Sequence, residues 1–157
     1  MKIVIITHNQ DRHFYFCNQI IEKTDGVIGV ISGAKYTYNS KRTKLKKLIG
    51  NFFPLLKKGV LDFFYKSWGE RLAKEKNQAE VNYFTNQKNF FFEHHANQLI
   101  AEVSAETGSV NNPEMIKKIR QLNPDLIVVM GSCLLSKELI DSAKNILNMH
   151  TGLSPYY

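Results

Sequence analysis

Short apolar runs alternate along the chain with longer segments whose apolar residues recur every three or four positions. The runs KIVIIT, at 2–7, and VIGVIS, at 27–32, flank a segment at 12–23 with helical spacing. Fully apolar, β-branched runs are typical of strands buried on both faces of a parallel sheet. Strand, helix and strand in succession predict a βαβ unit with a right-handed crossover.

The same alternation returns near the C-terminus. Asn112 as N-cap, Pro113 at the first helical position and Glu114 beside the positive end of the dipole predict a helix start. Its buried stripe is Met115, Ile116, Ile119 and Leu122, and Asn123-Pro124 ends it. A strand LIVVM at 126–130 follows.

We further expect a helix over 137–143 capped by Ser136, a last strand around Ile146–Met149, and a helix over 93–106. Alternating strands and helices predict an α/β fold with a parallel sheet.

The segment 35–92 interrupts this alternation as an insert after the second strand. Two apolar stripes with helical spacing predict amphipathic helices; they are Leu45, Leu48, Ile49, Phe52 and Phe53, ending at Pro54, and Leu61, Phe64, Trp68 and Leu72. Residues 35–78 hold twelve Lys or Arg and three acids, a net charge of +9, so the remainder of a chain of net charge +7 carries −2. The stripes pack on their own domain with the lysines solvated, or the basic face contacts a membrane surface, an anionic lipid or nucleic acid.

Composition is that of a globular protein with one core, since 43% of the 157 residues are hydrophobic and 22% are charged. Cys17 and Cys133 lie far apart without metal-ligand spacing, which favours reduced thiols and a cytoplasmic location. The first apolar run, Ile3–Ile6, is too short for a signal peptide, and no run approaches the length of a membrane span.

Polar residues after the first strand form a candidate site. The turn Thr7–Asp11 contains no glycine, so it lacks the dinucleotide and phosphate-loop fingerprints. His8 and Asn9 either form a hydrogen-bonded turn or contribute to a site, because ligands bind at the carboxyl ends of parallel strands. The run Glu93-His94-His95 does not predict a metal site, because adjacent histidines on a helix point about 100° apart.

The last strand carries a second candidate site. Asn148 and His150 are two residues apart, so their side chains share one face of the strand, at its carboxyl end. Buried polar groups need partners, which makes a packing role for this pair hard to explain. An amide and a protonated imidazole can both donate to an oxyanion, so the pair indicates catalysis through such an intermediate.

The stretch NMHTGLSPYY at 148–157 resembles the Asn-x-His signature of the folate-dependent formyltransferases, the family of the glycinamide ribonucleotide, methionyl-tRNA and sugar-nucleotide N-formyltransferases. MKIVIIT and NPDLIVVMGSCLLSKELID agree in order with other stretches of that family. The resemblance covers most of the chain except the basic insert. It implies a Rossmann-like fold and 10-formyltetrahydrofolate as co-substrate. The version His-Thr-Gly-Leu-Ser-Pro is similar to proteins that modify amino sugars for surface polysaccharides.

By this resemblance Asn148 donates to the formyl oxygen, and His150 stabilises the tetrahedral oxyanion and helps to move a proton. The resemblance also implies that backbone groups of one loop bind the pterin ring. The residues of this loop are Met130, Gly131, Ser132, Cys133, Leu134 and Leu135. Cys133 then lines the site and is not a nucleophile. No metal is implied.

One part of the family pattern has no counterpart. The third catalytic residue of the family is an aspartate on a later strand, and nothing up to Tyr157 matches it. We therefore expect an incomplete catalytic domain over 1–157 that transfers formyl groups poorly. The alternative hypothesis is a non-catalytic α/β module whose basic insert docks on an anionic surface. A homo-oligomer is compatible with either.

Overall fold

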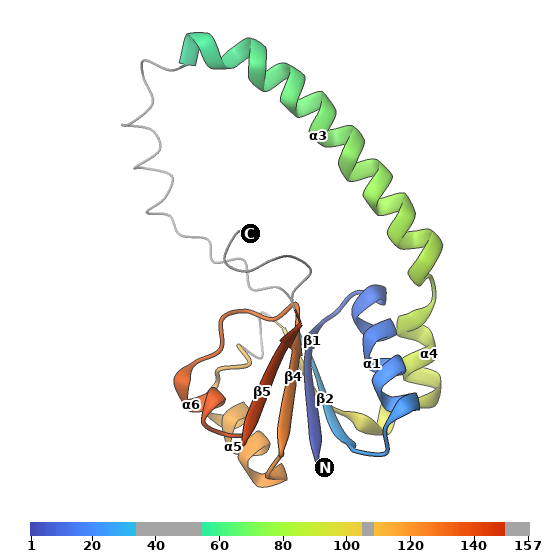
Figure 1. Ribbon diagram of the computed structural model, residues 1–157, viewed down its shortest axis with the longest axis vertical. Coiled ribbons are helices and arrows are strands. Elements are labelled where there is room, and N and C mark those ends of the chain that lie inside the picture. Colours follow the sequence, from blue (N-terminus) through green and yellow to red (C-terminus); the bar gives the residue numbers. More distant parts are fainter. Residues whose placement is uncertain (34–54, 105–108, 150–157) are drawn as a thin grey trace. The chain divides into compact units, whose positions relative to one another are not determined.

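The computed structural model describes residues 1–33, 55–104 and 109–149, with the backbone alone over 55–67 (Figure 1). The chain divides into two compact units, one formed by Met1–Tyr36 with Phe84–Tyr157 and the other by Thr37–Tyr83. The family-relevant strands and the candidate site residues belong to the first unit. The described part of the second unit belongs to one long helix.

A parallel sheet forms the centre of the first unit. Its strands are β1 (Ile3–His8), β2 (Val27–Gly33), β3 (Leu99–Val103), β4 (Leu126–Met130) and β5 (Asn145–Met149), in the order β3-β2-β1-β4-β5. All four pairings are parallel. This arrangement confirms the predicted Rossmann-like α/β fold.

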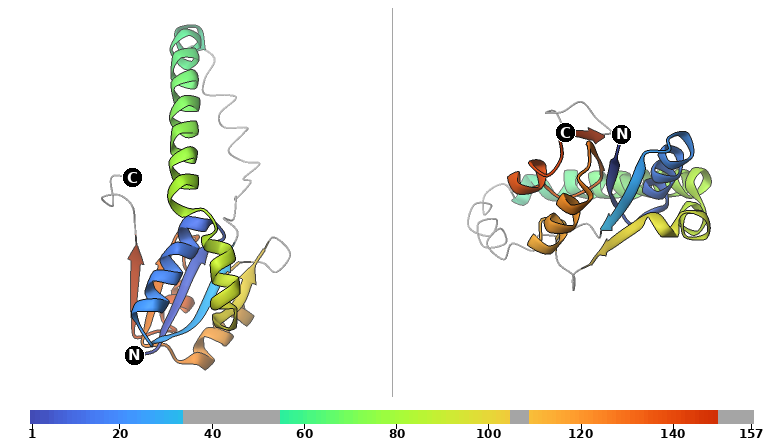
Figure 2. Two further views of the ribbon diagram at one scale, coloured as in Figure 1. Left: turned by 90° about the vertical axis from the view of Figure 1, so that its right-hand side faces the viewer. Right: turned by 90° about the horizontal axis from the view of Figure 1, so that it is seen from below.

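Helices cover both faces of the sheet (Figures 1 and 2). They are α1 (Asp11–Lys23), α4 (Gln87–His94), the 3-10 turn η1 (Ala96–Gln98), α5 (Pro113–Leu122) and α6 (Lys137–Ile140). On one face α1 and α4 pack together, with the rings of Phe14 and Phe91 4.9 Å apart. The predicted start of α5 is confirmed, because the Asn112 side chain accepts a hydrogen bond from Glu114 N at 3.0 Å and Pro113 is the first helical residue.

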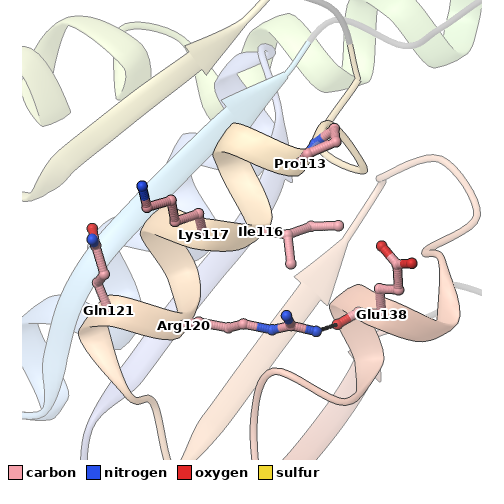
Figure 3. A pocket seen from close by; sticks show the side chains of 6 residues that line it. All are labelled: Pro113, Ile116, Lys117, Arg120, Gln121 and Glu138. Carbon is pink, nitrogen blue, oxygen red and sulfur yellow. Dashed lines mark hydrogen bonds between the residues drawn. The ribbon is translucent and has the colours of Figure 1, made fainter.

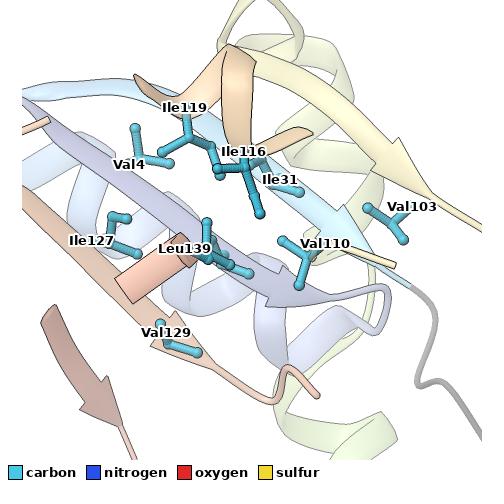
Figure 4. Close-up of a cluster of buried hydrophobic side chains, with 10 residues drawn as sticks. Val4, Ile31, Val103, Val110, Ile116, Ile119, Ile127, Val129 and Leu139 are labelled. Carbon is cyan, nitrogen blue, oxygen red and sulfur yellow. The ribbon is translucent and has the colours of Figure 1, made fainter. Parts of the chain in front are cut away.

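Two apolar clusters separate the helices from the sheet. One lies under α1 and α4 and consists of Ile3, Ile5, Phe14, Cys17, Val27, Val30, Phe91 and Val128. The other lies under α5 and α6 and consists of Val4, Ile6, Ile31, Val103, Val110, Ile116, Ile119, Ile127, Val129 and Leu139 (Figure 4). Strand β1 contributes to both clusters through alternate side chains, as expected for a strand buried on both faces.

The prediction of a helix over 93–106 is wrong. Helix α4 ends at His94, and Leu99–Val103 forms β3, which pairs with β2; residues 105 and 106 lie outside the described residues. The segment has enough apolar residues for either structure. Pairing with the free edge of β2 satisfies its backbone groups along a whole strand, and this tertiary gain decides the outcome.

Two other helix predictions differ from the structure. The helix expected over 137–143 ends at Ile140, although Ser136 caps it as predicted, accepting from Leu139 N at 3.3 Å. In the insert, α3 runs over Leu55–Phe84, longer than its apolar stripe. The side chains of Trp68 and Leu72 are 61% and 44% exposed. The helix expected over 45–53 lies outside the described residues.

Asp125 joins three strands at the amino end of the sheet. Its carboxylate accepts hydrogen bonds from Lys144 Nζ at 2.6 Å and from Lys2 N at 2.8 Å. Its backbone N–H donates to Lys2 O, and its carbonyl accepts from Asn145 N. The Lys144 ammonium, followed by the Lys2 backbone N–H, lowers the pKa of Asp125 from 3.8 to about 2.

The lowered pKa predicts how Asp125 contributes to stability at different pH values. The folded state favours the carboxylate, so the contribution is complete above the unfolded pKa of 3.8 and disappears as the pH falls towards about 2. Asp125→Asn should therefore lower the melting temperature at neutral pH, and its difference from wild type should shrink through that acid range. Asp141→Asn is the matched control, since its carboxylate is paired with Lys137 within one exposed helical turn. An Asp125→Asn difference that is constant from pH 7 to about 2 would contradict the role of this ionised group.

Candidate functional site

The strand order places a topological switch point between β1 and β4. From β1 the chain proceeds outward to β2 and β3, whereas β4 and β5 lie on the other side of β1. Ligands of open α/β sheets bind outside the carboxyl ends of the strands at such a point. The two strand ends are joined directly, because Thr7 Oγ1 donates to Met130 O at 3.0 Å.

Strand β5 brings Asn148 to this end of the sheet. Asn148 is paired with Val129 and Met149 with Met130, so Asn148 lies one residue before the level at which β4 ends. Asn148 is exposed, and so are most residues of β5. The premise that Asn148 is a buried polar group is therefore wrong, because β5 has a neighbouring strand on one side alone in the described sheet. His150 lies outside the described residues.

The loop Met130–Leu135 begins at the last residue of β4, and residues 131–135 have no regular secondary structure. Gly131 begins it with a φ of +74°, a conformation that favours glycine. Within the described part of the chain, no hydrogen bond between backbone groups of separate elements or loops involves Gly131–Leu135. Among the described residues, the backbone of other segments therefore does not occupy these peptide groups.

His13 fills the space beside Gly131. A Cβ atom at position 131 would lie 2.3 Å from His13 Nε2, so the imidazole occupies the place of a side chain. His13 is 2% exposed, and burial, helped by the nearby Arg12 and His8, lowers its pKa to about 4. The ring is therefore neutral at physiological pH, and a neutral ring can be buried at lower cost than a charged one.

His8 and Asn9 form the hydrogen-bonded turn that was one of the two interpretations of this segment. His8 Nδ1 bonds to Gly33 O, and because a carbonyl only accepts, Nδ1 carries the proton. Asn9 Nδ2 donates to Glu102 Oε1 at 2.8 Å. These bonds connect the end of β1 to the ends of β2 and β3.

Polar groups from the segment before α5 surround the other end of the loop. Asn111 Nδ2 donates to Leu134 O at 2.9 Å, and Asn111 Oδ1 accepts from Ser136 N at 2.7 Å. The Cys133 thiol lies 3.7 Å from Ser109 Oγ and 3.8 Å from Asn111 Nδ2. By contrast Cys17 lies in the core, where burial raises the pKa of its thiol to about 12 and keeps it protonated.

Other features of the first unit lie apart from this region. Glu93 and His94 end α4, and the rings of His94 and His95 are 6.4 Å apart. Residues 1–33, 55–104 and 109–149 hold no group of three potential metal ligands. A groove of about 380 Å³ lies between α5 and α6, lined by Pro113, Ile116, Lys117, Arg120, Gln121 and Glu138 (Figure 3). No helix among the described elements is long and apolar enough to cross a bilayer.

The fold and the strand-end site define a Rossmann-like α/β domain whose polar groups meet at the carboxyl ends of β1, β4 and β5. A family model described as formyl transferase matches residues 1–157. The chain therefore belongs to the formyl transferase family, and its activity is formyl transfer. A comparison with curated proteins gives no match.

Two residues of this region were missed by sequence reasoning. His13 lies within the first predicted helix, and Asn111 precedes the predicted N-cap of α5. The signal for Asn111 was the polar pair Asn111-Asn112. Capping α5 requires only Asn112, so the sequence assigned no role to Asn111. For His13 the signal was a histidine on the buried stripe of a helix, but nothing local connects it with Gly131, 118 residues further along the chain.

The contact between His13 and Gly131 can be tested by a double-mutant cycle. Gly131→Ala introduces a Cβ at positive φ and into the imidazole, so we expect it to reduce the free energy of unfolding by at least about 2 kcal/mol. In a His13→Ala background the steric part disappears, and the same substitution should cost about 1–2 kcal/mol. Urea unfolding of the four proteins measures the coupling. Equal costs in both backgrounds would show that the imidazole does not restrict position 131.

Proposed function

We propose that this protein is an N-formyltransferase that moves the formyl group of 10-formyltetrahydrofolate to a primary amine of a nucleotide-linked amino sugar in the cytoplasm. Membership of the formyl transferase family supports the formyl-transfer step. The folate donor rests on the resemblance of 130–135 and of Asn148-x-His150 to the folate-dependent branches. The amino sugar rests on His150-Thr151-Gly152-Leu153-Ser154-Pro155, which resembles proteins of that substrate class.

The observation that carries the proposal is the position of Asn148 relative to the loop after β4. Asn148 is paired with Val129, one residue before the end of the strand from which the loop begins, which supports a role for its amide there. The loop has peptide N–H and C=O groups that the described backbone contacts do not use. A flat heterocycle with donors and acceptors on its edge, such as a pterin, fits such a set of backbone groups.

The proposed chemistry uses the exposed amide of Asn148 as a donor. The amine attacks the formyl carbon, the C=O electrons move to the oxygen, and Asn148 Nδ2 donates to the resulting oxyanion. His150, which follows β5 in the sequence, supplies a second donor and carries a proton from the attacking amine to N10 of the folate. The bond between the formyl carbon and N10 then breaks, which leaves the N-formylated amine and tetrahydrofolate. Exposure of Asn148 in the free protein agrees with this role, because its amide then remains available to a ligand.

We further propose that residues 1–157 lack one part of this machinery. The family aspartate has no counterpart among them, and its carboxylate would favour a protonated His150. A positioned acid–base group contributes about 10²–10⁴-fold to such steps. Transfer by residues 1–157 alone is therefore expected to be slower, by about this factor, than transfer assisted by such a carboxylate.

Contact of the basic insert with an anionic surface stays a prediction. The surplus positive charge belongs to residues 35–67. Further along α3, acidic residues largely balance the basic ones, as in the ion pairs Arg71–Glu75 and Lys76–Glu80. This distribution of charge gives no reason to prefer a non-catalytic module that docks on an anionic surface over a formyltransferase.

Folate binding gives the first test of the function. With 5-formyltetrahydrofolate, which is not a formyl donor in this reaction, at 100 times its Kd, the free energy of unfolding should rise by about 2.7 kcal/mol. Thermal or urea unfolding at several ligand concentrations measures this gain. No stabilisation at millimolar folate, in a chain shown to be folded by circular dichroism, would contradict a folate site.

Turnover gives the second test, and it uses a version of the chain extended through an aspartate-bearing strand of the family type. Asn148→Ala should lower kcat/KM by about 10²–10³-fold, the usual effect of removing one oxyanion donor. Asn145→Ala is the matched control, because Asn145 is an exposed asparagine at the opposite end of β5 and should leave kcat/KM unchanged. The unextended chain should be slower than the extended one by about 10²-fold or more. Equal rates for the two chains would show that no further acid–base group is needed.

A further inference from the structure

We propose that Asn111 is a positioning residue that holds the loop Met130–Leu135 in the conformation that binds folate. The inference rests on the proposed function, in which this loop contacts the pterin ring. Asn111 lies before α5, outside the strand-loop-strand segment that carries the family motifs. Its side chain nevertheless bonds to two backbone groups of the segment that follows β4.

The geometry of these bonds is that of a peptide group inserted between two residues of the segment. Asn111 Nδ2 donates to the carbonyl of Leu134, and Asn111 Oδ1 accepts from the N–H of Ser136. Donor and acceptor of one rigid amide thus meet an acceptor and a donor two residues apart, as a neighbouring strand would do. The amide replaces backbone hydrogen bonds that the loop does not make within the described chain.

Asn111 is itself held from several directions. Its backbone N–H donates to Ser109 Oγ at 3.2 Å, and Val110 before it is buried in the cluster under α5. Asn112 after it is the N-cap of α5, whose residue Ile116 lies in the same cluster. The side chain at position 111 therefore projects from an anchored backbone, which is the condition for a precise positioning contact.

The contact acts at the most exposed residue of the loop, because Cys133 and Leu135 on either side of Leu134 pack against the cluster under α5 and α6. Thr7 fixes Met130 at the beginning, and Ser136 begins α6 at the other end. Between these points the Leu134 side chain is 94% exposed, so it adds no packing of its own to hold the backbone there. Without Asn111 the peptide groups near Leu134 would sample several orientations, and folate binding would have to select one of them.

The experiment measures folate affinity and backbone protection in three variants. Asn111→Ala removes both bonds and should weaken 5-formyltetrahydrofolate binding about tenfold, the change expected from the loss of two neutral hydrogen bonds. Asn111→Asp keeps an acceptor for Ser136 N but places a carboxylate oxygen against Leu134 O, so it should also weaken binding. Asn112→Ala is the matched control, because it removes the neighbouring side chain that caps α5 by accepting from Glu114 N and leaves Asn111 in place. It should leave folate affinity within about twofold of wild type.

Amide hydrogen exchange at Ser136, followed by NMR without folate, tests the two hydrogen bonds of Asn111 independently of folate binding. In wild type and Asn111→Asp this amide should be protected, and in Asn111→Ala its exchange should accelerate at least tenfold while the amides of β4 stay unchanged. Unchanged exchange at Ser136 in Asn111→Ala would show that Asn111 does not hold the loop, whether or not folate binds. If Ser136 exchange responds as expected and wild type binds folate, equal affinity of wild type and Asn111→Ala would overturn the positioning role. If wild type does not bind folate, the proposed function fails, and with it the role of Asn111 in binding.

Discussion

The arrangement of the site depends on the burial of β1 between two parallel neighbours. Residues Ile3–Ile6 are at most 3% exposed and face both apolar clusters, so β1 cannot leave the middle of the sheet without exposing both cores. Its pairing with β4 then fixes where β4 ends, and the Thr7–Met130 bond joins the two ends. The loop after β4 and the amide of Asn148 on β5 are placed relative to this pair of strands.

Rigid strand ends carry a loop that is held mainly by side chains. A glycine at positive φ begins the loop, a buried neutral histidine fills the space beside that glycine, and an asparagine amide binds near the other end. Such an arrangement leaves peptide groups of the loop available to a ligand, whereas a regular turn or strand would use them internally. The stability of the sheet and the availability of the loop are therefore supplied by different residues.

The amino end of the sheet shows a contrasting use of polar groups. Asp125, just before β4, accepts from Lys2 before β1, from Lys144 before β5 and from Asn145 of β5, so its function is to align strands. At the carboxyl end the polar groups His8 and Asn9 also connect strands, but Asn148 remains exposed. This difference between the two ends agrees with the rule that α/β sheets bind ligands at the carboxyl end.

The sequence by itself determined the strands β1, β2, β4 and β5, the cap at Asn112 and the family, because these depend on residues close together in the chain. Tertiary structure alone decided that 99–103 is a strand and that most residues of β5 are exposed, since both follow from which strand edges are free. It also decided the contacts of His13 with Gly131 and of Asn111 with Leu134, because residues separated by 118 and 23 positions meet only when strand order has been set by burial. Local periodicity records which face of an element is apolar, but not which neighbour will cover it.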